Sequence, residues 1–139
     1  KTSKVLKIIN SKIYYITGDK GKIDEDGFLT IVDRYSRFAK LAGEMISLGI
    51  IEEKISKLID LEENNLVDFI ITTIEDDKKG EKIILLISHV NEEYISLLKE
   101  KILNSFENKL MIPSNIKIID EVPRLGSGKK DFAKAKLLV

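Results

Sequence analysis

A glycine-bearing stretch that ends in lysines, Leu125–Lys130, is the most suggestive run of residues in this chain. It lacks the spacing of a Walker A phosphate loop, which needs a glycine where Pro123 stands and Ser or Thr where Lys130 stands. Such a stretch could instead carry the Lys129 ammonium into a site formed elsewhere. There it would meet negative charge developing on a phosphoryl or acyl group. The alternative is an ordinary solvated basic loop.

Two further side chains could take part in nucleotide chemistry. Asp19 follows a β-forming run and Gly18, and a carboxylate at a strand end can accept hydrogen bonds from a ribose diol. Its alternative is an Asx turn with no ligand. Arg34 closes the second strand of an expected hairpin and could face the same ligand. Arginine deserves individual reading because the chain has 20 Lys and only three Arg, and only the guanidinium is a planar fork.

The composition excludes several classes of site. With no Cys and a single His, His89, the chain is not expected to form a thiolate or histidine-built metal site or a Ser-His-Asp triad, and we expect no metal site. Its 23 basic and 23 acidic residues cancel, which leaves no global field for nucleic acid or an anionic membrane. Apolar runs such as Ile83–Ile87 are far too short to span a bilayer. We therefore expect a soluble, cytosolic-type fragment of a longer protein.

Turn signals and hydrophobic periodicity predict the elements that position these residues. The expected strands are one at 12–17, a hairpin over 22–32 turning at Asp24–Gly27, a hairpin over 37–47 turning at 42–44, and strands at 66–74, 82–88 and 116–121. The expected helices are one over 49–60 capped by Ser47, one from Asn91 to about Leu110, and a short one capped by Asp131.

This order of elements describes an α+β fold, a small mixed sheet of about three strands flanked by helices and preceded by β-hairpins. The most plausible boundary lies near 34–37, after the first hairpin. We therefore expect residues 1–35 and 36–139 to belong to different units.

Seven short motifs follow one another along the chain: Tyr15–Asp19, Asp26–Phe28, Asp33-Arg34, Lys40, Gly43, Ile51-Glu52 and Pro123–Lys129. In this order and spacing they resemble the C-terminal part of AMP-forming acyl-activating enzymes, the superfamily of acyl-CoA synthetases, peptide-synthetase adenylation domains and luciferase. The resemblance covers about residues 13–132. It implies that residues 1–35 are the last strands of a large adenylation domain and that 36–139 are the mobile C-terminal domain.

Two longer runs, Arg37–Leu48 and Leu125–Phe132, narrow this resemblance. They look like the synthetase half of bifunctional 2-acylglycerophosphoethanolamine acyltransferase/acyl carrier protein synthetases. The resemblance then implies ATP and Mg²⁺ as cofactors, and fatty acid, acyl carrier protein and lysophospholipid as partners. It also implies work at the bacterial inner membrane through domains outside this fragment, which alone should be inactive. The alternatives are the same domain of an acyl-CoA ligase and a non-catalytic carrier-protein docking module.

The family's roles transfer to the matching positions. Asp19 would hold the ribose hydroxyls of ATP and AMP, and Arg34 would contact the nucleotide. Lys129 would reach the acyl carboxylate and the α-phosphate during adenylation. Lys40 matches a lysine that serves the second half-reaction in some members. Gly43 matches the glycine of the hairpin that faces the active site during thioester formation.

The family's small domain swings between two poses, and the resemblance places the hinge at Ser36, where most members have Asp or Lys. Many members have Arg where Met45 stands, and its absence here favours carrier protein over coenzyme A. Docking of an acidic carrier protein would need a local basic patch. The candidates for this patch, each with an ordinary solvated side chain as its alternative, are Arg37, Lys40, Lys54 and Lys57.

Overall fold

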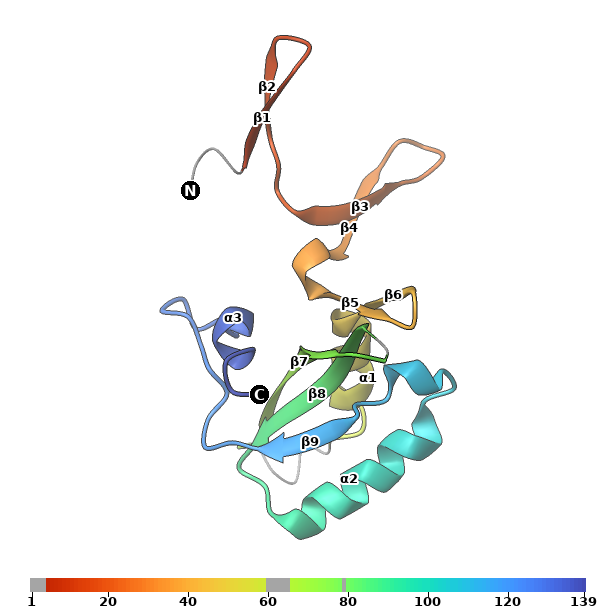
Figure 1. Cartoon of the computed structure of the whole chain (residues 1–139), viewed down its shortest axis with the longest axis vertical. Coiled ribbons are helices and arrows are strands. Elements are labelled where there is room, and N and C mark those ends of the chain that lie inside the picture. Colours follow the sequence, from red (N-terminus) through yellow and green to blue (C-terminus); the bar gives the residue numbers. More distant parts are fainter. Residues whose placement is uncertain (1–4, 60–65, 79) are drawn as a thin grey trace. The chain divides into compact units, whose positions relative to one another are not determined.

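The computed structural model describes residues 5–59, 66–78 and 80–139. It divides the chain into two units, Lys1–Arg37 and Phe38–Val139 (Figure 1). The assignment of the first unit to a larger domain stays a prediction.

The first unit contains two antiparallel hairpins. β1 (Leu6–Ile9) pairs with β2 (Lys12–Tyr15), and β3 (Asp19–Ile23) pairs with β4 (Leu29–Arg34). The β3–β4 hairpin turns where the sequence predicts. The sequence does not predict β1, which joins β2 through a two-residue turn with Asn10 and Ser11 at positive φ. A short 3-10 turn, η2 (Tyr35–Arg37), follows β4.

Apolar side chains of these hairpins are exposed throughout. Ile8 is 76% exposed, Ile13 72% and Phe28 70%, and none of the described residues up to Arg37 is buried. The described part of the first unit therefore has no hydrophobic core of its own.

The second unit is built on a five-stranded sheet. Its strands are β5 (Phe38–Leu41), β6 (Glu44–Ser47), β7 (Asp68–Asp76), β8 (Gly80–Ser88) and β9 (Asn115–Ile118). β7 and β8 form a long antiparallel ladder, and β9 runs parallel to β8. The sheet exceeds the expected three strands because the β5–β6 hairpin joins β8 through the pair Leu41↔Gly80.

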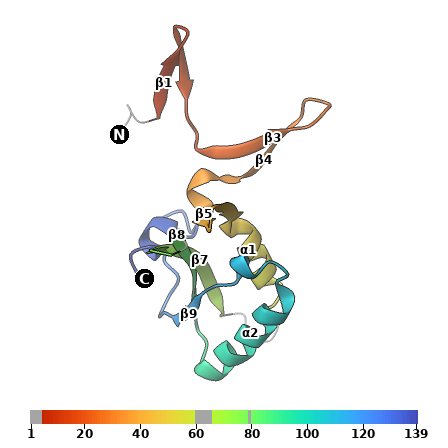
Figure 2. The same cartoon turned by 45° about the vertical axis from the view of Figure 1, so that its right-hand side comes forward.

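Helices cover both faces of this sheet (Figures 1 and 2). α1 (Leu48–Ser56) and α2 (Glu92–Ser105) share one core with alternate residues of β7 and β8, including Ile71 and Leu85. α3 (Phe132–Ala135) packs on the opposite face, where Ile70 and Leu86 point. This alternation is the two-residue period of a sheet buried on both sides. The predicted α+β class is confirmed.

The three predicted N-caps are confirmed. The side chains of Ser47, Asn91 and Asp131 accept hydrogen bonds from the backbone amides of Ile50, Tyr94 and Lys134.

The helix ends differ from the prediction. α1 ends at Ser56, and the expected end at residue 60 lies outside the described residues. α2 ends at Ser105 rather than near Leu110, because Phe106 turns to an extended conformation and buries its ring. A 3-10 turn, η3 (Lys109–Met111), follows.

Candidate functional site

The segment around Lys129 forms a closed hairpin. The Leu125 amide donates to the Lys129 carbonyl at 2.8 Å, and the Gly128 amide donates to the Leu125 carbonyl at 2.8 Å. Gly128 has φ +80°, a region that favours glycine, so the turn explains why a glycine precedes the lysine. The glycines thus shape a turn that presents Lys129, and they form no phosphate-binding helix start.

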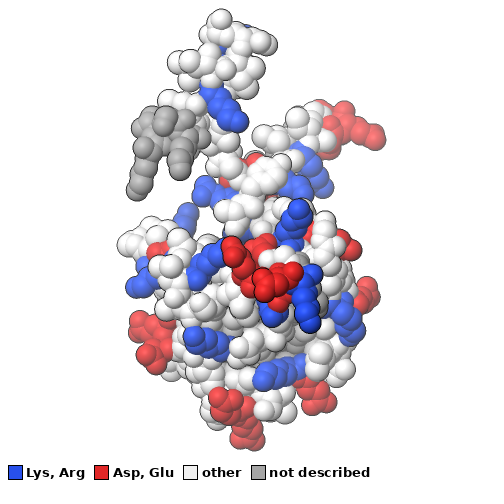
Figure 3. Space-filling view, viewed as in Figure 1, with Lys and Arg blue, Asp and Glu red and all other residues white. Residues whose placement is uncertain are grey.

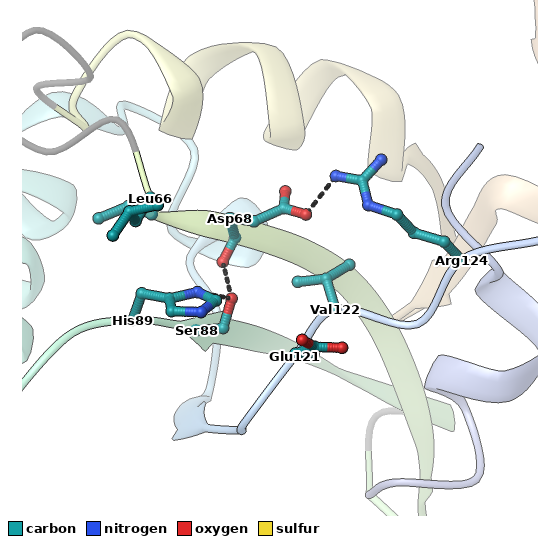
Figure 4. A pocket seen from close by; sticks show the side chains of 8 residues that line it. Leu66, Asp68, Ser88, His89, Glu121, Val122 and Arg124 are labelled. Atoms are coloured by element: carbon teal, nitrogen blue, oxygen red, sulfur yellow. Dashed lines mark hydrogen bonds and ion pairs between the residues drawn. The ribbon is translucent and has the colours of Figure 1, made fainter. Parts of the chain in front are cut away.

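A carboxylate from a distant strand braces this hairpin (Figure 4). One Arg124 nitrogen, Nη1, donates to the Gly128 carbonyl at 2.8 Å, and the other, Nη2, donates to Asp68 Oδ2 at 2.5 Å. Lys130 Nζ lies 3.7 Å from Asp68 Oδ1 and 4.4 Å from the centre of the Phe69 ring. Asp68 and Phe69 begin β7, so the sheet and the hairpin are connected through side chains.

The three cations of this segment are therefore in different states. Arg124 and Lys130 share the Asp68 carboxylate, whereas the exposed Lys129 makes no ion pair with any residue that the structure describes. An exposed ammonium on a braced turn can be offered to an anion that arrives from outside the domain.

A hollow of about 710 Å³ lies beside the ion pair of Arg124 and Asp68. Figure 4 shows its lining, which carries both signs of charge: Leu66, Val67, Asp68, Ser88, His89, Glu121, Val122 and Arg124. His89 Nδ1 lies 3.1 Å from the buried Ser88 hydroxyl, which donates to the Asp68 carbonyl at 3.3 Å. The exposed His89 thus lies beside the Ser88 hydroxyl in the lining of the hollow.

Asp19 and Arg34, the two predicted nucleotide contacts, lie side by side in the first unit. They are cross-strand partners in β3 and β4, and Arg34 Nε donates to Asp19 Oδ1 at 3.0 Å. The side chains are 26% and 67% exposed, so both remain accessible. The Tyr35 amide closes this end of the hairpin by donating to the Gly18 carbonyl at 2.8 Å. The structure therefore places a carboxylate and a guanidinium at one accessible strand end.

Lys40 and Gly43 lie on the β5–β6 hairpin of the second unit. The turn places Ala42 and Gly43 at φ +50° and +90°, and open space surrounds Gly43 where a Cβ would be. Lys40 is exposed and pairs across the strands with Met45, which is 54% exposed. The hairpin tip is therefore small, accessible and uncrowded.

Glu81 fixes this hairpin to the sheet. Its carboxylate accepts a hydrogen bond from the Lys40 backbone amide at 2.6 Å and one from the Thr73 hydroxyl at 2.7 Å. Thus Glu81 holds the β5–β6 hairpin near the start of β8, whereas Asp68 holds the Lys129 hairpin near the end of β8.

The remaining predicted residues show a mixed outcome. Ser36 is exposed within η2, at the end of the first unit, and its role as a hinge stays a prediction. Lys57 Nζ pairs with Glu53 Oε1 at 2.7 Å, which lowers the pKa of Glu53 below its usual range. Lys54 Nζ lies 5.3 Å from the centre of the Phe106 ring. Docking by these lysines and by Arg37 stays a prediction.

Sequence reasoning missed the residues that hold the site. The sequence patterns point to neither Asp68 nor Glu81, because each acts on a segment far away along the chain. Glu52 belongs to one of the short motifs, and in the structure its carboxylate accepts a hydrogen bond from the Ile71 amide at 3.2 Å. The signal that could have found Asp68 and Glu81 is a carboxylate inside or beside a strongly apolar strand.

Charges of both signs are interspersed on the face shown in Figure 3. Within the described ranges, no group of three or more His, Asp or Glu side chains is arranged to hold a metal ion. Over the same ranges, no helix has both the length and the hydropathy needed to cross a bilayer.

The chain is similar in sequence to part of several curated ligases. It is 32% identical over 120 residues to the medium-chain-fatty-acid–CoA ligase of Ectopseudomonas oleovorans, with 84% of this chain and 20% of that protein covered. It is 30% identical over 126 residues to the 2-succinylbenzoate–CoA ligase of Listeria monocytogenes, with 88% and 25% covered. The chain thus spans about a fifth to a quarter of these curated relatives. No protein-family model matches it.

The fold has clear counterparts among solved structures. ATP-bound MatB from Rhodopseudomonas palustris matches with a TM-score of 0.74 and 19% identity, over 99% of this chain and 26% of that chain. An acyl-CoA synthetase (AMP-forming)/AMP-acid ligase II-like protein from Dyadobacter fermentans matches with a TM-score of 0.69 and 20% identity, over 93% and 36%. At these identities the likeness concerns the fold alone.

Proposed function

We propose that this chain is the C-terminal part of an AMP-forming acyl-CoA ligase and supplies the adenylation lysine of that enzyme. Its sequence similarity to curated CoA ligases and the likeness of its fold to an AMP-forming ligase support this proposal. The observation that carries the proposal is the state of Lys129. It stands exposed on a braced turn, while the cations on either side of it are engaged. A non-catalytic docking module would need no such lysine.

The first half-reaction would join a fatty acid to AMP. A carboxylate oxygen attacks the α-phosphorus of ATP, the bond from that phosphorus to pyrophosphate breaks, and acyl-AMP forms. Negative charge gathers on the α-phosphoryl oxygens in the transition state. The Lys129 ammonium would stabilise that charge and position the carboxylate.

The second half-reaction would use the β5–β6 hairpin. A thiol sulfur attacks the acyl carbon, AMP leaves, and the thiol proton passes to solvent. The open space at Gly43 suits close approach of a thiol-bearing arm, and Lys40 lies on the same hairpin. A rotation at Ser36 would exchange the Lys129 hairpin for this one, so that one domain serves both steps.

The first unit would belong to the large domain that holds the nucleotide. The apolar side chains of its hairpins are exposed, and burying them would require another protein surface. The second unit has a hydrophobic core of its own and does not require such a surface. Asp19 would accept hydrogen bonds from the ribose hydroxyls, with Arg34 holding the carboxylate in place beside the nucleotide. Mg²⁺ would reach the site with the ATP phosphates.

Acyl carrier protein is the acceptor that we propose. The support is the resemblance of two runs, Arg37–Leu48 and Leu125–Phe132, to acyl carrier protein synthetases. The exposed Met45 also supports it, because many members of the superfamily have arginine at this position. Coenzyme A is the alternative acceptor, and it is the one that the names of these curated relatives print. We further propose that the full-length protein is bifunctional, with an acyltransferase activity that transfers the fatty acid to a lysophospholipid at the cytoplasmic side of the bacterial inner membrane.

Pyrophosphate exchange in the full-length enzyme tests the first step. Lys129→Ala should slow fatty-acid-dependent exchange of labelled pyrophosphate into ATP by roughly 10²–10³-fold, the size expected for one preorganised charge. Lys136→Ala, an exposed lysine beyond the hairpin, is the control and should leave exchange unchanged. Normal exchange in Lys129→Ala would refute the proposed role.

The acceptor is tested by competition. Carrier protein and coenzyme A are offered together at equal concentration, and the thioester products are separated by mass spectrometry. Predominant acyl–carrier protein supports the proposed acceptor. Predominant acyl-CoA would replace it with the acyl-CoA ligase alternative.

A further inference from the structure

We infer that Asp68 is a positioning residue for Lys129, acting through Arg124. The inference rests on the proposed function, because it concerns how the adenylation lysine is held. Asp68 lies 56 residues before Arg124, and among the described residues no hydrogen bond or ion pair joins it to Lys129. Its effect on chemistry would therefore be indirect.

The geometry of the Arg124 guanidinium supports this role. One side of the fork holds Asp68 at 2.5 Å, and the other holds the Gly128 carbonyl at 2.8 Å, directly before Lys129. The Arg124 guanidinium thus connects the turn to β7. The hydrogen bond from the Leu125 amide to the Lys129 carbonyl stabilises the turn itself. Lysine could not replace Arg124, since a single ammonium lacks the planar pair of nitrogens.

Charge adds a second contribution. The Asp68 carboxylate faces both Arg124 and Lys130, so two of the three local cations are partly neutralised. Without it, both would be released beside an anionic nucleotide and could hold its phosphates in unproductive positions. Loss of the carboxylate should thus lower the rate of adenylation rather than weaken ATP binding.

A purely structural role for Asp68 predicts a different pattern. Asp68 Oδ1 also accepts from the Phe69 amide at 2.9 Å, which stabilises the start of β7. Asp68→Asn keeps an oxygen for that amide and removes the charge, so the variant separates the two roles. Glu121→Gln is the matched control, because Glu121 lines the same hollow and makes no ion pair among the described residues.

The test is a double-mutant cycle in the full-length enzyme, read by pyrophosphate exchange. Asp68→Asn should lower kcat about 10-fold to 100-fold with KM for ATP unchanged or lower, the cost of a misplaced catalytic group. In the Lys129→Ala background the same substitution should change kcat by less than about twofold, because no lysine remains to position. Arg124→Lys should resemble Asp68→Asn, and Glu121→Gln should match the wild type.

The outcomes distinguish this inference from the proposed function. If Lys129→Ala leaves exchange intact, the proposed function fails and the inference fails with it. If Lys129→Ala is slow but Asp68→Asn is normal, or equally harmful with and without Lys129, only the inference fails. Acyl transfer from preformed acyl-AMP should stay normal in Asp68→Asn, and a parallel loss there would indicate a general structural defect and overturn the inference.

Discussion

Replacing Glu81 by alanine should destabilise the domain, because one carboxylate holds two donors from different elements. The Lys40 amide and the Thr73 hydroxyl lie 2.6 and 2.7 Å from its two oxygens. Thr73 is only 6% exposed, so its unpaired hydroxyl would cost about 1–3 kcal/mol, whereas water can replace the partner of the exposed Lys40 for about 1 kcal/mol. We expect Glu81→Ala to lower the free energy of unfolding by about 2–4 kcal/mol.

Urea unfolding followed by circular dichroism measures this loss. Glu75→Ala is the control, because Glu75 lies directly opposite Glu81 in the ladder, is exposed, and makes no ion pair within the described ranges. Removing a like charge at that position should be neutral or slightly stabilising. A loss below about 0.5 kcal/mol in Glu81→Ala, the ordinary range of surface substitutions, would refute the argument.

Three further predictions concern binding and motion. Residues 1–139 alone should bind ATP weakly, since one carboxylate–ribose contact in water is worth about 1 kcal/mol, and micromolar affinity by calorimetry would contradict the divided site. Ser36→Pro in the full-length enzyme should spare one half-reaction and impair the other by fixing φ at the hinge, and unchanged kinetics in both would move the hinge elsewhere. Replacing both Lys54 and Lys57 by Glu should slow the loading of carrier protein at low salt and leave adenylation unchanged. Most of the effect should come from Lys54, because Lys57 already forms an ion pair with Glu53. Wild-type loading by the double variant would exclude this face.

Local signals in the sequence predicted the local structure well. The caps Ser47, Asn91 and Asp131 act within three residues, so their side-chain chemistry is readable without a fold. The tight turn at Ala42-Gly43 was predicted for the same reason. The end of α2 was not, because Phe106 leaves the helix to fill a core assembled from distant elements.

Long-range partners could not be predicted from the sequence. The candidate residue Lys129 was identified, but the carboxylate that braces its hairpin lies on a strand whose register only the fold defines. The same holds for Glu81, which is 41 residues away from Lys40, whose backbone amide donates a hydrogen bond to the Glu81 carboxylate. The strand β1 is not predicted from the sequence, because the turn residues Asn10-Ser11 are a weaker hairpin signal than Asn-Gly.

The central claim, that Lys129 serves one half-reaction of a two-step ligase, is tested most directly by transfer from purified acyl-AMP. The full-length enzyme and its Lys129→Ala variant are mixed with acyl-AMP and acceptor, and thioester formation is followed in a single turnover. The account predicts that the variant transfers the acyl group within about threefold of the wild-type rate, although its adenylation is roughly 10²–10³-fold slower. Equal losses in both half-reactions would contradict it.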